Sequence, residues 1–218
     1  MRLVRARVGW KSRPRCAAAL TCIALLWCSC AQAADTHAYL LRGWFGVFST
    51  GMDELAGELK AQGIKANAIG HLSWKSSVSK IVEDKASCKL GALVLVGHSQ
   101  GAINAIEIAR ALESHKIPVD LLVTLVPSMQ NGVPANVLHA MNFYQNPGWG
   151  APLSADRDFR GKLSNIDLAS ELTVTHITID KNAKVQAEIV RAVLAIPKSK
   201  EVCQRNGSSK SESGVKRQ

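Results

Sequence analysis

The chain has 218 residues, a length that fits one domain of ordinary size. Its composition is 47% hydrophobic and 20% charged, which is enough apolar material for a core and excludes intrinsic disorder for most of the chain. The formal net charge of +10 lies at the two ends, because residues 35–197 hold fifteen basic and fifteen acidic side chains. A basic nucleic-acid-binding surface on the folded part is therefore not expected.

The first 34 residues have the pattern of a secretory signal. Six Lys or Arg and no acid lie in this segment, an apolar run follows at Cys16–Trp27, and Ala31-Gln32-Ala33 is a small-x-small cleavage pattern. The apolar run is shorter than the ~20 residues that span a bilayer. We expect cleavage near Ala33 or Ala34 and a periplasmic or secreted protein. An uncleaved anchor and a lipid-modified Cys30 are the alternatives.

Removal of the signal would leave two cysteines, Cys88 and Cys203. Two thiols in an exported protein most simply form one disulfide, and two unpaired thiols are the alternative. Two cysteines alone do not make a zinc site, and neither H-x-x-E-H nor H-E-x-x-H occurs, so no metal site is expected.

Apolar segments alternate with helical patterns along the body of the chain. This order predicts a parallel sheet covered by helices on both faces. Strands are expected at 38–41, 65–69, 92–96, 119–126, 140–144 and 172–177, and helices at 50–63, 76–86, 101–114 and 182–196. Two long connections, 127–137 and 146–169, are rich in turn-forming residues and are candidates for function. Residues 198–218 read as a flexible basic tail, which leaves 35–197 as a single domain.

One motif predicts specific chemistry. Residues 93–102, LVLVGHSQGA, are a strand, a G-x-S-x-G sequence and the start of a helix. A Ser on this sharp turn is held with its hydroxyl clear of the sheet, and Gly97 and Gly101 allow the strand and helix to approach closely. Ser99 is therefore the candidate nucleophile, and the N–H of Gln100 is a candidate oxyanion donor. A Gly/Ser turn without catalytic function is the alternative.

A serine nucleophile needs a base. His176 precedes the last predicted helix and is the choice, with a structural His as the alternative. His71 ends a strand on the same edge and could line the site, whereas His98 is expected to point away from it. The loop after the first strand, RGWFG, offers the N–H of Trp44 or Phe45 as the second oxyanion donor.

The chain resembles the α/β-hydrolase superfamily, and most closely its small, capless bacterial lipase- or thioesterase-like members. The segments that carry the resemblance are YLLRGWFGVFSTGMDEL, LVLVGHSQGA, VPANV with NFYQ, and HITIDKNAKV. It implies a three-layer α/β/α sandwich with a mostly parallel sheet of about six strands. It also implies a Ser-His-acid triad, an ester or thioester substrate and no cofactor. The aromatic residues that could line an acyl pocket are Trp44, Phe45, Phe48, Trp74 and Trp149.

The acid of the triad departs from the family pattern. Such relatives place Asp in a sequence like T-x-D-P, where this chain reads Thr124-Leu125-Val126-Pro127. Asp167 is the first substitute, followed by Asp156, Asp158 and Asp180. A Ser-His dyad without an acid and a fold that has lost catalysis are the other readings.

Two functions follow from these observations. The first is an exported serine hydrolase that cleaves a small-molecule acyl ester or thioester with Ser99 and His176. The second is a catalytically silent envelope or binding protein, for which Val126 is the evidence. Neither reading expects nucleic acid, stable membrane insertion after signal cleavage or a cofactor as a partner, and the sequence leaves the oligomeric state open.

Overall fold

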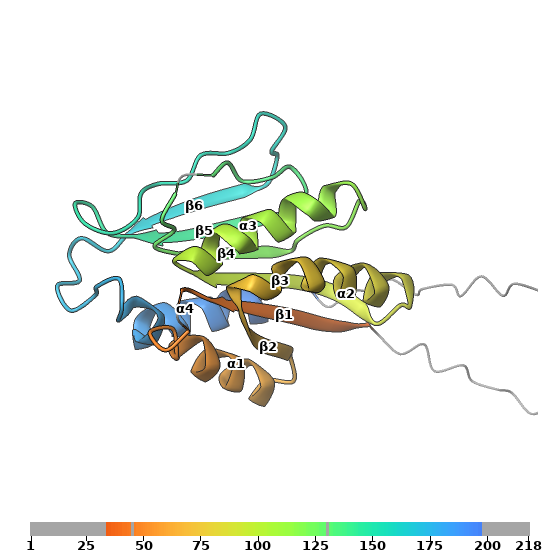
Figure 1. The fold of residues 1–218 in the computed structure, drawn as a ribbon, viewed down its shortest axis with the longest axis horizontal. Coiled ribbons are helices and arrows are strands. Elements are labelled where there is room, and N and C mark those ends of the chain that lie inside the picture. Colours follow the sequence, from red (N-terminus) through yellow and green to blue (C-terminus); the bar gives the residue numbers. More distant parts are fainter. Residues whose placement is uncertain (1–33, 45, 130, 198–218) are drawn as a thin grey trace, which may run out of the picture. The chain divides into compact units, whose positions relative to one another are not determined.

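A computed structural model of the chain describes residues 34–44, 46–129 and 131–197 (Figure 1). The strands are β1 (Asp35–Arg42), β2 (Lys65–Gly70), β3 (Leu90–His98), β4 (Leu121–Leu125), β5 (His139–Tyr144) and β6 (Lys162–Asp167). The α-helices are α1 (Gly51–Ala61), α2 (Trp74–Ala86), α3 (Gln100–Glu113) and α4 (Ala183–Leu194), with short 3₁₀ helices η1 (His71–Ser73) and η2 (Ile179–Lys181).

The six strands form one sheet in the order β2-β1-β3-β4-β5-β6, and every neighbouring pair is parallel. The predicted fold class is therefore confirmed. Because all strands run the same way, their carboxyl ends share one edge of the sheet, which is where ligands bind in open α/β sheets. The strand β3, which leads to Ser99, lies in the interior of the sheet.

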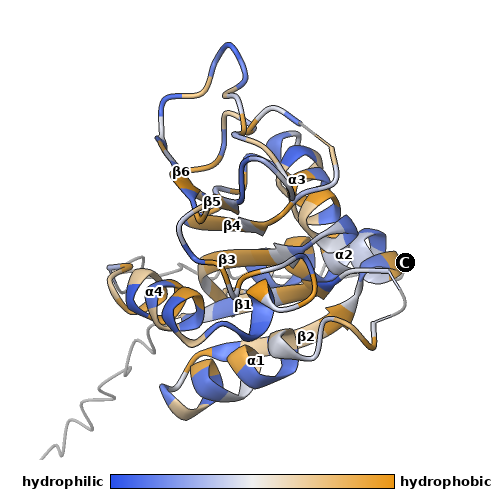
Figure 2. Ribbon diagram, turned by 90° about the vertical axis from the view of Figure 1, so that its left-hand side faces the viewer, coloured by the Kyte–Doolittle hydropathy of each residue, from blue (hydrophilic) through white to orange (hydrophobic). Residues whose placement is uncertain are grey.

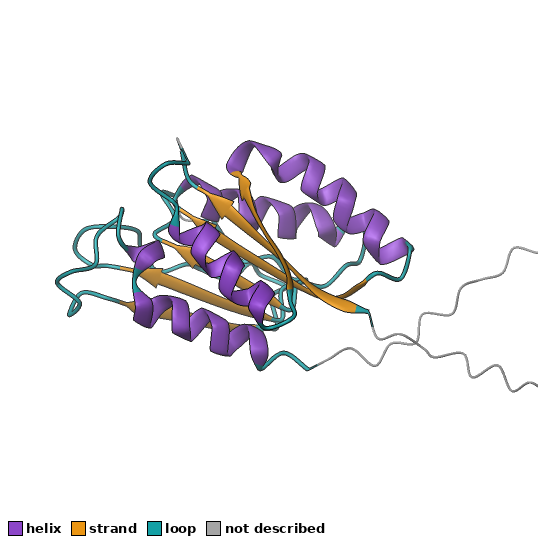
Figure 3. Ribbon diagram, turned by 90° about the horizontal axis from the view of Figure 1, so that it is seen from below, coloured by secondary structure: helices purple, strands orange, loops and turns teal. Residues whose placement is uncertain are grey.

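Helices cover both faces of the sheet (Figure 3). One apolar core packs α1 and α4 against residues such as Leu40, Val94 and Val123. The other packs α2 and α3 against the opposite side of the same strands, at residues such as Leu41 and Leu95. The alternation along each strand sends successive side chains into the two cores, which is why the interior strands read as continuous apolar runs.

The last strand differs from the prediction. The segment 172–177 was expected to be a strand, but it forms turns, and β6 lies at 162–167 inside the predicted long loop. β6 is an edge strand with only partly buried side chains, so the sequence KLSNID shows no apolar run. Its pairing with β5 is supported by Asn165, whose Oδ1 accepts from Nδ2 of Asn142 in β5. The same side chain bonds the N–H and carbonyl of Leu153 in the connecting loop.

Hydrogen bonds of threonine hydroxyl groups explain why residues 172–177 do not form an extended strand. The N–H of Thr175 donates to Oγ1 of Thr178 at 2.8 Å, and that hydroxyl also donates to the carbonyl of Thr173 at 3.0 Å. Such local side-chain bonds offer the backbone an alternative to a strand ladder. The consequence is that His176 lies on a turn rather than in a strand.

Several predictions concern parts of the chain outside the described residues. The signal segment, the basic tail, Phe45 and Cys203 are among them, so the disulfide between Cys88 and Cys203 stays a prediction. Within 34–44, 46–129 and 131–197, the helices are all too short or too polar to cross a bilayer. In the same ranges no three His, Cys, Asp or Glu side chains gather as metal ligands.

Gly101→Ala should destabilise the fold, because its Cβ would lie 2.2 Å from the carbonyl oxygen of Leu41. We expect a loss of about 1–3 kcal/mol in the free energy of unfolding, the usual cost of overpacking, measured by urea denaturation. Gly57→Ala in α1 is the matched control, since its Cβ would meet open space, and a gain of about 0.5–1 kcal/mol is expected there. If both variants change the free energy of unfolding equally, the close approach of α3 to β1 at Gly101 is contradicted.

Candidate active site

Ser99 lies on a strained turn between β3 and α3. Its backbone has φ 55° and ψ −119°, which L-residues rarely adopt. The turn is possible because Gly97 and Gly101 have no side chains: a Cβ on Gly97 would lie 2.3 Å from the carbonyl oxygen of Gly101. The N–H of Ser99 is held by the carbonyl of Leu125 at 2.9 Å. This is the geometry of a nucleophile elbow.

His176 reaches Ser99 from the loop between β6 and α4. Its Nε2 lies 2.9 Å from Oγ of Ser99, which is hydrogen-bonding distance and suits proton transfer. The structure thus brings together two residues that lie 77 positions apart in the sequence. A basic nitrogen at this distance from a serine hydroxyl can accept its proton during nucleophilic attack.

The second ring nitrogen of His176 is without a partner in the described part of the chain. Its Nδ1 is buried and makes no hydrogen bond with the described residues. Val126, at the position where the resemblance to α/β-hydrolases led us to expect an acid, lines the same cavity as His176 and is buried. Its backbone has φ 44°, a left-handed conformation that Asp and Asn adopt several times more often than other residues and that is strained for a β-branched residue. The backbone therefore keeps a shape suited to Asp or Asn although the side chain is Val.

The predicted substitute acids are engaged elsewhere. Asp167, the first candidate, accepts the N–H groups of Asn146 and Ala169 with Oδ1, at 3.2 and 2.9 Å. It ends β6 and fixes the start of the β5–β6 loop, so the structure does not give it the role of partner to Nδ1 of His176.

The other candidates do not take that role either. Asp156 pairs with Arg110 at 2.6 Å, and Asp158 is exposed. Asp180 is fully buried and accepts the N–H of Gly51 at 2.9 Å. Among the described residues, the geometry of Ser99 and His176 is that of a dyad.

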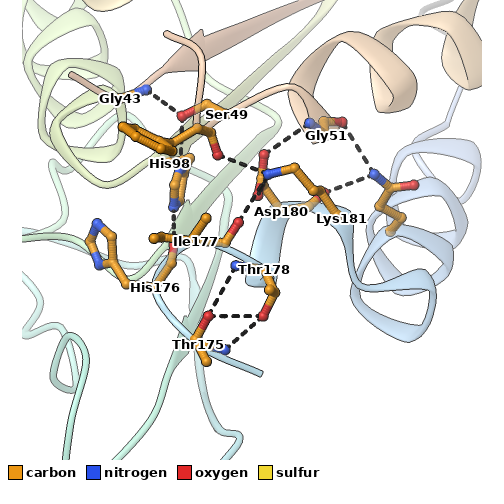
Figure 4. Close-up of polar contacts among 12 residues, drawn as sticks. Gly43, Ser49, Gly51, His98, Thr175, His176, Ile177, Thr178, Asp180 and Lys181 are labelled. Carbon is orange, nitrogen blue, oxygen red and sulfur yellow. Dashed lines mark hydrogen bonds and ion pairs between the residues drawn. The ribbon is translucent and has the colours of Figure 1, made fainter. Parts of the chain in front are cut away.

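His98 was expected to point away from the site, and this expectation was wrong. Its ring is buried, with Nδ1 2.7 Å from Oγ of Ser49 and Nε2 2.7 Å from the backbone carbonyl of His176 (Figure 4). A carbonyl only accepts, so Nε2 carries the proton and Nδ1 accepts from the Ser49 hydroxyl. Ser49 in turn accepts the N–H of Gly43 at 3.0 Å.

This chain of hydrogen bonds joins the loop after β1 to the loop that carries His176. It holds the backbone of His176, whereas an acid would hold its ring. The sequence could not indicate it, because a His inside G-x-S-x-G carries no periodic signal and Ser49 is one of many loop serines. The contact becomes visible only in the folded structure, where the loop that carries His176 passes the end of β3.

Lys181 and Asp180 make a second connection between the same loops. The Lys181 ammonium donates to the carbonyls of Phe48 and Ile177 at 2.8 and 2.9 Å, and also contacts Asp180 (Figure 4). A Cβ on Gly51 would lie 2.2 Å from the carbonyl oxygen of Asp180. The start of α1 and the segment just after His176 are therefore packed directly against each other.

The predicted oxyanion donor Gln100 follows Ser99 in the chain, and Gly43, the neighbour of the second candidate Trp44, lies against Ser99. Gln100 is the first residue of α3, so its N–H has no acceptor within the helix. Gly43 lies against the nucleophile, since a Cβ there would be 3.2 Å from Cβ of Ser99. The N–H of Gly43 is already donated to Ser49. That leaves the next residue, Trp44, as the described candidate for the second donor; Phe45 lies outside the described residues.

A cavity of about 360 Å³ lies beside His176. Its walls come from the loops after β4 and β5, at 126–129 and 148–151, and combine apolar side chains with polar groups. The ring centroid of Trp149 is 5.0 Å from that of His176. Of the five aromatic residues expected in an acyl pocket, only Trp149 is among the described walls, and Trp74 packs against the core under α2 and α3.

Burial sets the protonation state of both histidines. The pKa of His98 is lowered by burial, although Asp180 and the carbonyl of His176 oppose the shift. The pKa of His176 is also lowered, by burial and by its neighbour His98, while Asp180 acts in the opposite sense. Both rings are therefore neutral near pH 7, as a general base requires.

The free energy of unfolding should fall as the pH drops below about 6.5. In that range the unfolded chain binds protons that the buried imidazoles of His98 and His176 resist, so stability rises with pH. Urea denaturation at pH 5 and pH 7.5 measures the difference. His98→Asn should reduce the pH dependence, whereas Ser49→Ala should lower stability at both pH values and keep the slope. An unchanged slope in His98→Asn would contradict a buried neutral His98.

Comparison with known proteins finds similarity in structure but no match by sequence. No family model matches the sequence, and no curated protein matches it. The structure is similar to the product of a Listeria innocua gene, with a TM-score of 0.52 and 12% identity over 77% of this chain and 97% of that one.

Two further similar structures have names that refer to activity. A proposed hydrolase of the alpha/beta superfamily from Xanthomonas campestris has a TM-score of 0.39 and 17% identity, over 72% of this chain and 98% of that one. The RedJ thioesterase from the prodiginine biosynthetic pathway of Streptomyces coelicolor has a TM-score of 0.45 and 10% identity, over 73% and 91%. With its parallel six-stranded sheet, helices on both faces and elbow after β3, the chain has the α/β-hydrolase fold.

Proposed function

We propose that the protein is a serine hydrolase that cleaves a carboxylic ester or thioester. The observation that carries the proposal is the 2.9 Å contact between Oγ of Ser99, on a strained elbow, and Nε2 of His176. The strain has a use in such a mechanism, because it keeps the hydroxyl clear of the sheet where a carbonyl carbon can approach.

The residues take complementary roles in the reaction. Ser99 attacks the carbonyl carbon while His176 accepts its proton, and His176 then donates that proton to the leaving alcohol or thiol. In the second half of the reaction, His176 accepts a proton from water, which attacks the acyl-serine. His176 then donates that proton to Oγ of Ser99 as the acid is released. The N–H groups of Gln100 and Trp44 stabilise the oxyanion that forms in each step.

The substrate side of the site suits an acyl group. Apolar side chains, Val126 and Met129 among them, line part of the cavity beside His176, with Trp149 next to the proposed base. Apolar walls favour a hydrocarbon chain, since its burial is worth about 0.8 kcal/mol per CH₂. A volume of about 360 Å³ fits a small or medium acyl group rather than a polymer. The name of the similar RedJ thioesterase is consistent with such a substrate.

A binding protein without catalysis is the second candidate, and one observation favours it. Nδ1 of His176 has no partner among the described residues, and Val126 stands where an acid is expected. Loss of the acid in a serine protease lowers the rate ~10⁴-fold. In this chain the hydrogen bond from His98 to the carbonyl of His176 holds the base in place, and for that reason we favour a working dyad. The proposal places the protein in the periplasm or outside the cell, on the evidence of its N-terminal segment.

Labelling with a fluorophosphonate probe tests the nucleophile. The purified protein should become covalently labelled at Ser99, and Ser99→Ala should prevent both labelling and hydrolysis of p-nitrophenyl acetate. Gln100→Ala is the control for folding of the turn, since it keeps the N–H groups and the hydroxyl. Hydrolysis that survives Ser99→Ala would refute the mechanism, and absence of labelling in the parent would favour the binding protein.

Val126→Asp should increase activity by about tenfold or more, because a carboxylate at this position can orient and stabilise the imidazolium. It should also raise the pKa of His176. Activity of the parent is lost below a pKa that lies under the ordinary 6.5, so the acid limb of kcat/KM should move to higher pH in the variant.

Val126→Asn is the matched control for this change. It accepts the same left-handed backbone and has nearly the same shape, but it carries no charge. It should relieve the backbone strain without moving the acid limb. If kcat/KM and its pH profile are the same in both variants as in the parent, position 126 does not face the base.

A further inference from the structure

The edge of the sheet that carries Ser99 also carries most of the exposed large apolar side chains of the described residues. Figure 2 views this edge. Large apolar side chains are exposed in the loops that follow several different strands, and we refer to them as the apolar collar: Trp44, Phe48, Leu72, Trp149, Leu172 and Ile177. Leu172 is 89% exposed and Leu72 83%. Single exposed apolar residues are common, but a gathering of them marks an interaction site.

The collar is specific to this edge. Of the other large apolar side chains that are about half exposed or more, Val47 lies in the loop of Trp44 and Phe48, and Met129, in the loop after β4, lines the cavity beside His176. Among the described residues, only Leu138 and Leu194 lie elsewhere. The collar also surrounds the site: Trp149 contacts the His176 ring, and Ile177 follows that residue directly. Trp44 stacks on His71, at 6.5 Å between ring centroids, which brings the η1 loop with Leu72 to the same edge.

The charges beside the collar are largely neutralised within the chain. Arg42 forms an ion pair with Asp53, and Lys184 pairs with Glu171 at 2.9 Å. Lys181 donates to two carbonyls and to Asp180. Residues 35–197 carry equal numbers of basic and acidic side chains. A strongly charged protein partner would therefore find little complementary charge here.

We propose that the apolar collar binds a lipid surface and that the ester substrate is taken from it. The inference rests on the proposed function, because a surface that surrounds Ser99 presents acyl esters directly to the nucleophile. Exposed Trp and Leu side chains suit the boundary between headgroups and acyl chains, where Trp places its apolar ring and its polar N–H. The binding is driven by apolar burial, so it does not require anionic lipid.

Sedimentation with phosphatidylcholine vesicles tests the collar. The double variant Leu72→Ser with Leu172→Ser should lower the partition coefficient of the purified protein about tenfold or more, because two exposed leucines lose their apolar contact with lipid. The double variant Leu138→Ser with Leu194→Ser is the matched control, since it removes two exposed leucines away from this edge, and it should bind like the parent. Binding of the parent should change little between 50 and 500 mM salt.

The outcomes separate this proposal from the proposed function. Leu72 and Leu172 do not line the cavity, so both double variants should hydrolyse soluble p-nitrophenyl acetate at the parent's rate. Equal vesicle binding in the two double variants, or binding that disappears at high salt, would overturn the collar and leave the hydrolase intact. A collar variant that loses self-association but no vesicle binding would assign the surface to a second copy and also overturn the proposal. Vesicle binding without any hydrolysis would refute the proposed function alone.

Discussion

The close approach of β3 and α3 is the constraint on which the site depends. Gly97 and Gly101 let the chain turn back so tightly that Ser99 takes a conformation with φ 55°. The cost of that strain is of order 1–3 kcal/mol, and it is offset by two apolar cores that hold the strand and the helix on either side of the turn. A hydroxyl fixed in this way needs only a base at the right distance to become a nucleophile.

The base is positioned through its backbone. In a triad, a carboxylate orients the imidazole by bonding its second nitrogen. Among the residues that the structure describes, that nitrogen has no partner. The loop is held instead by the bond between His98 and the carbonyl of His176 and by the contacts of Lys181 with two loop carbonyls. These bonds fix where His176 lies but do not stabilise its charge, so under the proposed function we expect slower catalysis than a full triad would give.

The surroundings of the site are consistent with a substrate that is mainly apolar. Apolar side chains line part of the cavity beside His176, and most of the exposed large apolar residues lie at the same edge. Both features come from the loops at the carboxyl ends of the strands. Because loop residues are exposed, few core constraints act on them, and large apolar side chains at such positions are costly unless something covers them.

The sequence by itself determined the fold class, five of the six strands, the four helices and the elbow, because each depends on local patterns. Continuous apolar strands alternate with amphipathic helices, and G-x-S-x-G directly follows one of those strands. The pairing of Ser99 with His176 could be expected from chain order, although the strand predicted around His176 does not form.

Tertiary structure alone decided the rest. The strand β6 is stabilised by backbone pairing at an edge, which leaves little apolar signal in KLSNID. Asp167 anchors a loop instead of orienting the base, and His98 bonds the loop of His176. These outcomes depend on which distant segments meet at the end of the sheet, and a hydrogen bond between residues 78 positions apart leaves no mark in the periodicity of either segment.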